Sequence, residues 1–348
     1  MAVPVRASAP PAIGADKIFL ALQSGVVVAH RISDGVEAWR VEMRTDQAIA
    51  VDGTRVFVAS GEAVHALDSG DAAVVWRAPT GTLTAPILAQ DGWIVVASAT
   101  ELAAFRAEDG ARVWRRELGP QHNRPTIEGD NLYVPLDDGR LFALDLRTGA
   151  DRWVQRVVSP RRPAAATASP ALSEVLAYPD RLFLGASDGR VLALKAVDGS
   201  LVWRSSIGAV LRGRPVGDGT RIFVSAMDNV VRAFDRGNGA LLWHPGLPFR
   251  PMGPVMIGTR LVVPGASAEV RAFDIAGRPA GQIKLEAALA IPPAFSESAG
   301  GRIMAGVTDS LDGPSKLFLI EESRALPIVP LTELPGVTVP VEPPTPKS

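Results

Sequence analysis

The chain has 348 residues and no cysteine, and its 36 Lys and Arg residues nearly balance its 37 Asp and Glu residues. The lack of cysteine excludes disulfide bridges, cysteine metal sites and thiol catalysis, and the balanced charge excludes a nucleic-acid partner held by bulk electrostatics. Residues 1–6 are not followed by an apolar stretch of signal-peptide length, and the longest apolar runs, such as residues 18–22, are too short to span a membrane.

One phrase recurs along the chain and divides it into units. Each copy opens with an alanine, passes through a corner rich in Asp and Gly, and closes on a tryptophan ten residues after the alanine. The six tryptophans are Trp39, Trp76, Trp114, Trp153, Trp203 and Trp243, spaced by 37, 38, 39, 50 and 40 residues. A seventh copy begins at Ala272 but has no tryptophan. A period near forty with several short strands per unit is typical of propeller blades rather than of helical repeats.

Residues 130–153 show the unit most clearly. The alternation of apolar residues predicts strands over residues 132–135 and 141–145. Asp138-Gly139 joins them, and this pair suits a tight hairpin because Gly adopts positive φ freely and Asp tolerates it. The chain then turns at Thr148-Gly149 into a third strand that carries Trp153.

A fourth strand precedes this hairpin in most units and is marked by a proline. These prolines are Pro10, Pro86, Pro125, Pro170, Pro215, Pro254 and Pro293. We expect these strands to be the innermost ones, lining a central channel where pairing is sparse enough to tolerate proline. The predicted fold class is therefore all-β, a β-propeller of four-stranded blades, eight in number, with seven blades as the alternative.

The last blade and the C-terminus are the least regular parts of the pattern. We assign residues 290–295, 302–307 and 317–321 to blade eight, and either residues 325–331 or the N-terminal segment to its fourth strand. The propeller then occupies residues 1–331 as a single domain. Residues 332–348 are rich in proline, and we expect them to form a poorly ordered tail.

The complete unit resembles a known repeat. An aliphatic strand, Asp-Gly, a strand ending in Ala-Leu-Asp, Thr-Gly and Trp together resemble the pyrroloquinoline-quinone (PQQ)-like β-propeller repeat, and the segment from Ala143 to Trp153 is similar to its tryptophan-docking motif. This repeat occurs in quinoprotein dehydrogenases and in a non-enzymatic, BamB-like branch. The resemblance extends over almost the whole chain, and it implies the architecture more strongly than the function because one fold hosts many sites.

The tryptophans and the arginines are the two candidate sets of special residues. One tryptophan at the same point of each blade indicates a wedge between blades, although ligand stacking is the other interpretation; Trp93 is out of register and has no predicted role. Arginines gather where the chain enters consecutive inner strands, which predicts a basic arc around one channel mouth, binding an acidic partner segment or an anionic small molecule. The arc comprises Arg124, Arg161, Arg162, Arg212, Arg214 and Arg250.

Two features qualify this prediction. Arg161 and Arg162 fall in a unit lengthened by an insertion, which is either a functional loop or a tolerated surface insertion. Carboxylates in turns of the same face could neutralise the arc from within the protein, or serve only as turn formers. These carboxylates are Asp137, Asp138, Asp188 and Asp228.

The leading functional hypothesis is a non-catalytic scaffold that binds other proteins through its face loops, as one copy within a larger complex, in cell-envelope or outer-membrane protein assembly. We expect no catalytic residue, no metal site and no cofactor. The alternatives are a PQQ-dependent dehydrogenase with calcium and a small-molecule or sugar-sensing propeller. The resemblance favours the periplasm if an export or lipoprotein signal precedes Met1, and the cytoplasm is the alternative.

Overall fold

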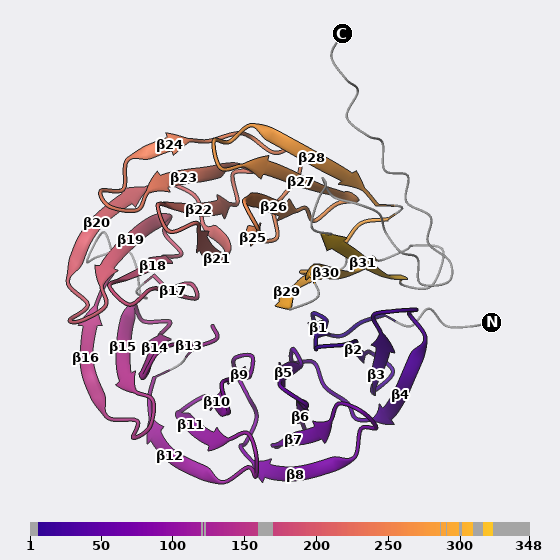
Figure 1. Ribbon diagram of the computed structural model, residues 1–348. Coiled ribbons are helices and arrows are strands. Elements are labelled where there is room, and N and C mark those ends of the chain that lie inside the picture. Colours follow the sequence, from indigo (N-terminus) through magenta and orange to yellow (C-terminus); the bar gives the residue numbers. More distant parts are fainter. Residues whose placement is uncertain are drawn as a thin grey trace.

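The computed structural model describes residues 6–119, 121, 123–158, 170–285, 287–289, 291–298, 301–308 and 316–322. Within these residues the strands form eight antiparallel sheets arranged in a ring (Figure 1). Seven sheets have four strands and the eighth has three described strands. The prediction of an all-β propeller with eight blades is confirmed.

Each of the first four blades is a meander of four consecutive strands. Blade 1 contains β1 (Ala12–Ile13), β2 (Lys17–Leu22), β3 (Val26–Arg31) and β4 (Glu37–Glu42). Blade 2 contains β5 (Ala50–Asp52), β6 (Arg55–Ser60), β7 (Ala63–Asp68) and β8 (Val74–Pro79). Blade 3 contains β9 (Leu88–Gln90), β10 (Trp93–Ala97), β11 (Glu101–Arg106) and β12 (Arg112–Glu117). Blade 4 contains β13 (Thr126–Glu128), β14 (Asn131–Pro135), β15 (Arg140–Asp145) and β16 (Asp151–Arg156).

The second half of the ring repeats this order. Blade 5 contains β17 (Leu176–Ala177), β18 (Arg181–Gly185), β19 (Arg190–Lys195) and β20 (Leu201–Ser206). Blade 6 contains β21 (Leu211–Gly217), β22 (Arg221–Ala226), β23 (Val231–Asp235) and β24 (Leu241–Trp243). Blade 7 contains β25 (Val255–Ile257), β26 (Arg260–Pro264), β27 (Glu269–Asp274) and β28 (Pro279–Lys284). Blade 8 contains β29 (Ala294–Ser298), β30 (Gly301–Thr308) and β31 (Lys316–Glu322).

The short inner strands lie at the centre of the ring, as predicted, but their prolines mostly precede them (Figure 1). Pro125, for example, is followed by β13, whereas Pro215 alone of the marker prolines lies inside its strand, β21. Proline lacks the N–H that a strand donates to its neighbour, so it fits better just before the pairing begins.

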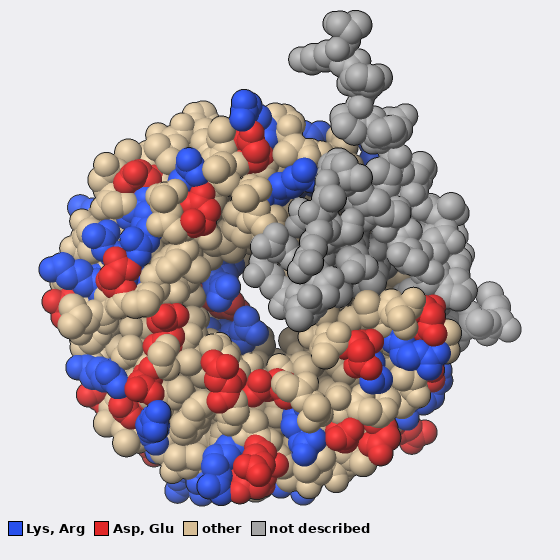
Figure 2. All heavy atoms as spheres, in the orientation of Figure 1, with Lys and Arg blue, Asp and Glu red and all other residues tan. Residues whose placement is uncertain are grey.

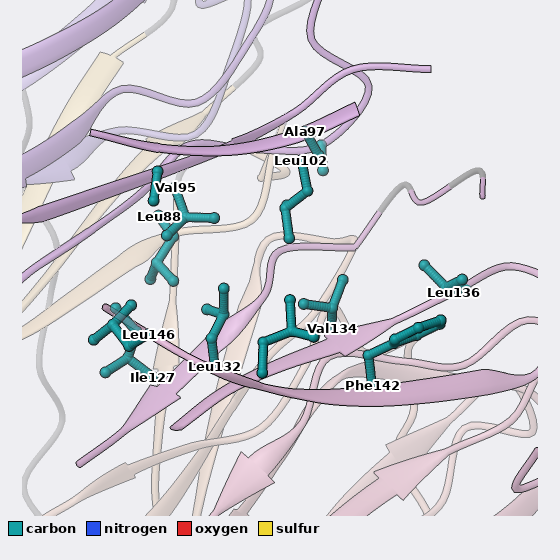
Figure 3. Packing of buried hydrophobic residues seen from close by; sticks show 13 residues of the cluster. Leu88, Val95, Ala97, Leu102, Ile127, Leu132, Val134, Leu136, Phe142 and Leu146 are labelled. Atoms are coloured by element: carbon teal, nitrogen blue, oxygen red, sulfur yellow. The ribbon is translucent and has the colours of Figure 1, made fainter. Parts of the chain in front are cut away.

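The apolar core lies between the blades rather than within any one of them. Figure 3 shows Val95 and Leu102 of blade 3 facing Leu132 and Val134 of blade 4, in one buried cluster. Trp93, which had no predicted role, packs against the same cluster. Because every blade buries its faces on its two neighbours, the ring is stabilised as a series of interfaces.

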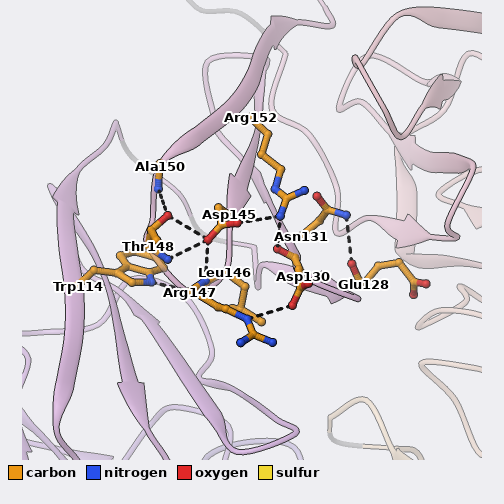
Figure 4. Close-up of polar contacts among 10 residues, drawn as sticks. All are labelled: Trp114, Glu128, Asp130, Asn131, Asp145, Leu146, Arg147, Thr148, Ala150 and Arg152. Carbon is orange, nitrogen blue, oxygen red and sulfur yellow. Dashed lines mark hydrogen bonds and ion pairs between the residues drawn. The ribbon is translucent and has the colours of Figure 1, made fainter.

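Each of the six tryptophans contacts the next blade in the same way. In Figure 4 the indole Nε1 of Trp114 donates a hydrogen bond of 2.8 Å to the carbonyl of Leu146, in the corner between β15 and β16. The ring lies on Gly149, whose φ is +70° and where an added Cβ would come within 2.7 Å of the indole. Equivalent bonds run from Trp39 to Ser69, Trp76 to Ala107, Trp153 to Ala196, Trp203 to Arg236 and Trp243 to Ile275.

The ring closes where blade 1 meets blade 8. Residues of β2 and β3 share an apolar cluster with Ala305, Val307 and Leu317 of blade 8. The N-terminal segment was one candidate for the fourth strand of blade 8; its described part pairs within blade 1, through the bridge from Ala7 to Leu22 and through β1 with β2, and residues 1–5 lie outside the described residues. Residues 325–331, the other candidate, and the predicted tail at residues 332–348 lie outside the described residues.

The two joints of blade 8, with blade 7 and with blade 1, differ from the other six, because no tryptophan follows Trp243 in the sequence. The first of them joins blades 7 and 8. Gly281 occupies the position of the missing tryptophan and pairs with Ala272, as each tryptophan pairs with the alanine of its own phrase. Apolar side chains such as Ile283, Leu285 and Met304 fill the interface instead.

Replacing Trp153 with alanine should lower the free energy of unfolding by ~3 to 5 kcal/mol, because it leaves a cavity between blades 4 and 5. The Trp153→Phe variant keeps an aromatic ring beside Tyr133, whose ring centroid lies 6.0 Å from that of Trp153. It removes the hydrogen bond to Ala196, so we expect a loss of about 1 to 2 kcal/mol. Denaturant titration measures both values, and a midpoint unchanged in Trp153→Ala would contradict the docking role.

Ala72 is the exception among the docking corners and gives a second prediction. It has a φ of 63° at the position where the corner under Trp114 has Gly149. A Cβ in this conformation costs about 1 kcal/mol or more. Glycine removes this strain but gives the unfolded chain more conformational entropy, so Ala72→Gly should raise the free energy of unfolding by a net value of about 0.5 to 1 kcal/mol. The matched change Gly149→Ala should lower the free energy of unfolding. Changes of the same sign and size at both corners would refute this account.

Candidate functional site

The inner strand of blade 6 is irregular at the point where two arginines of the predicted arc lie. Pairing of β21 with β22 joins Arg212 to Ser225 and resumes only at Val216, opposite Phe223. Strand β21 therefore has two more residues than β22 in this interval, which is a β-bulge. Arg214 lies inside the bulge, where the ladder does not dictate its direction.

Contacts on both sides hold this bulge in place. The Ser225 hydroxyl donates a hydrogen bond of 3.2 Å to the carbonyl of Arg212. Gly213 has a φ of +74° and packs so closely on blade 7 that a Cβ would lie 2.7 Å from the Cα of Gly253. Only glycine fits this approach, so the backbone next to Arg214 is fixed by packing.

Arg124 and Glu174 meet across the neighbouring inner strands of blades 4 and 5. Arg124 precedes β13, Glu174 precedes β17, and the two charged groups lie 4.0 Å apart. Two side chains that flank Arg124 tie the segments together. Asn123 donates to the carbonyl of Leu172 at 2.7 Å, and Thr126 donates to that of Val175 at 3.0 Å.

Arg214 completes this group, which we call the channel cluster (Arg124, Glu174 and Arg214). Its side chain is open to solvent, yet atoms of the channel wall surround it, and this desolvation lowers its pKa. The negative charge of Glu174 raises the pKa of Arg214, and the positive charge of Arg124 lowers it. Glu174 thus lies within electrostatic range of both arginines and forms its ion pair with Arg124.

The other arginines of the arc divide into two groups. Arg212 and Arg250 are exposed, on the inner side of blade 6 and on the segment that leads into blade 7. Arg161 and Arg162 lie outside the described residues. Figure 2 shows acidic and basic side chains interspersed over the visible face, and basic side chains on the wall of the central opening. The structure therefore places Arg124 and Arg214 within electrostatic range of Glu174, Arg212 on the same strand as Arg214, and Arg250 on the segment that leads into blade 7.

Three of the turn carboxylates that could have neutralised the arc have partners in their own blades. Each pairs with an arginine at the start of the following strand or near it: Asp138 with Arg140, Asp188 with Arg190 and Asp228 with Arg232. A carboxylate that sequence reasoning missed, Glu174, lies 4.0 Å from Arg124 of the arc. Its one sequence signal is its place in the part of the blade 5 insertion that follows Pro170.

The described residues contain no group of three or more His, Asp and Glu side chains that could hold a metal ion. They also contain no helix long and apolar enough to cross a membrane.

Eight antiparallel blades with a repeated indole contact between them define the chain as a β-propeller of the PQQ-like class, as predicted from the repeat. A family model described as "Outer membrane protein assembly factor BamB" matches residues 23–178 and 167–290. The chain belongs to this family of bacterial cell-envelope proteins.

Individual proteins agree with this assignment. The outer membrane protein assembly factor BamB of Moranella endobia (strain PCIT) is 25% identical over 248 residues, which cover 65% of this chain and 61% of that protein. The chain therefore matches less than two thirds of this relative's length. The crystal structure of BamB from Moraxella catarrhalis superposes with a TM-score of 0.73 at 20% identity, covering 93% of this chain and 97% of the other.

The same fold occurs in an enzyme. The quinohemoprotein alcohol dehydrogenase from Comamonas testosteroni matches with a TM-score of 0.67 at 12% identity, over 92% of this chain and 75% of that chain. At this level of identity the likeness shows the fold alone, and it transfers no chemistry.

Proposed function

We propose that this protein is a non-catalytic scaffold in outer-membrane protein assembly. It binds a protein partner through the basic face around the channel, which comprises the described arginines of the arc, Arg124, Arg212, Arg214 and Arg250. Membership of the assembly-factor family supports the process. In this proposal the protein acts in the cell envelope, as one copy within a larger complex and without a cofactor.

The choice of surface rests on how few acidic partners its arginines have: Arg124 lies 4.0 Å from Glu174, and Arg212 and Arg250 form no ion pair with another described residue. Among the described residues, no acceptor takes a hydrogen bond from the guanidinium groups of Arg124, Arg212, Arg214 and Arg250. Each guanidinium offers five donors in a planar fork that matches a carboxylate. A partner segment that carries Asp or Glu side chains fits this surface.

The test compares charge reversal on this face with charge reversal elsewhere. Deleting the gene in the source bacterium should lower the amount of folded protein in the outer membrane, measured by the heat-dependent gel mobility of its porins. The wild type should restore it, whereas Arg212→Glu combined with Arg250→Glu should not, because like charges repel an acidic partner. Both arginines are exposed, so we expect the fold to survive the change.

Arg77→Glu combined with Arg204→Glu is the matched control. Both residues are exposed on outer strands, β8 and β20, and the double change alters the net charge equally. This control should restore assembly fully. A deletion without effect on outer-membrane proteins would refute the proposed function, and full restoration by the Arg212 and Arg250 variant would place the partner surface elsewhere.

A further inference from the structure

The channel cluster has an excess of positive charge in a confined place. Arg124 of blade 4 pairs with Glu174 of blade 5 at 4.0 Å, and Arg214 lies in the bulge of the next inner strand, in blade 6, within electrostatic range of both. We propose that the cluster is a binding site for a small oxyanion, a phosphate or a carboxylate, with Glu174 as an internal competitor for the two arginines. This inference does not depend on the proposed function.

The cluster is built before any ligand arrives. The bonds from Asn123 and Thr126 hold the backbone on both sides of Arg124 against that on both sides of Glu174. The contact between Gly213 and Gly253 fixes the bulge that carries Arg214. A ligand therefore spends little binding free energy on ordering the backbone of its site, which favours affinity.

The arginine donors of the cluster are available to a ligand. Arg124 and Glu174 are 4.0 Å apart, which is an ion pair but is longer than a hydrogen bond. The side chain of Arg124 is 42% exposed and that of Glu174 is 28% exposed, so solvent or a solute reaches the pair. An oxyanion with two or more oxygens can accept N–H bonds from both guanidinium groups at once.

The electrostatics of the cluster favour an anion. The pKa of Arg214 is lowered chiefly by desolvation and to a smaller extent by Arg124, against the opposing effect of Glu174, so the cation is incompletely compensated in the free protein. A bound anion stabilises this desolvated cation, and the effect is larger beside a protein wall than in open water. Glu174 already supplies part of this stabilisation, and its negative charge opposes a second anion.

Removal of an arginine from the channel cluster and removal of the charge of Glu174 should change the affinity for an oxyanion in opposite directions. Isothermal titration calorimetry of the purified protein with inorganic phosphate, and separately with succinate, is carried out at constant ionic strength set with potassium chloride. Arg214→Met should weaken binding by about tenfold or more, because a charge-assisted pair of hydrogen bonds is lost. Glu174→Gln should strengthen it by about fivefold, because a like charge is removed without a change of shape.

Arg204→Met on the outer strand β20 serves as the control and should leave the affinity unchanged. If Arg214→Met does not fold, Arg124→Met supplies the same loss from a position outside the bulge. Binding of phosphate but not succinate, or the reverse, identifies which oxyanion the site takes. The proposal would be overturned if neither phosphate nor succinate bound to the wild type or to Glu174→Gln. It would also be overturned if Glu174→Gln did not raise the affinity. Neither result would affect the assembly experiment.

Discussion

The contact between each tryptophan and the following blade is the interaction on which the rest of the structure depends. A four-stranded blade cannot bury its own faces, since its apolar side chains, such as Leu132 and Val134, are covered only by a neighbour. The indole ring of Trp114 buries apolar surface on Gly149, which has no side chain to obstruct it, and its N–H donates a hydrogen bond to one carbonyl, that of Leu146. The ring therefore contributes buried area to the joint, and the hydrogen bond fixes the orientation of the two blades. Repeating this contact sets the angle between successive blades, and that angle decides how close the inner strands come to one another around the channel.

The basic face follows from this geometry and from local departures from it. Regular blades place their arginines opposite aspartates of their own turns, as in the pair of Asp138 and Arg140. The channel cluster arises where the pattern is broken, by the bulge in β21 and by the insertion that carries Glu174. In a repeat protein the regular positions maintain the ring, and the irregular ones are where a specific surface can develop without loss of the scaffold.

The sequence was sufficient for the architecture because the signals of a repeat reinforce one another. Six tryptophans in register and turn pairs such as Asp138-Gly139 predicted eight blades and their order. It was insufficient for the site because the decisive contacts are tertiary. The approach of Gly213 to Gly253 and the bonds from Asn123 and Thr126 join different blades, and no local pattern encodes them. Pro215 is an example, since it has the same position in the repeat as the other marker prolines but lies within a bulged strand.

Gly281, where the repeat would have a tryptophan, gives the ring a mechanical asymmetry. A closed ring with identical joints would share any outward strain equally along its perimeter. Here the two joints of blade 8 are secured by apolar packing without the directional indole bond. Outward strain would therefore fall unevenly and mostly on that blade, and the arginine-bearing blades 4 to 6 lie within the continuous run of tryptophan joints from blade 1 to blade 7 (Figure 1).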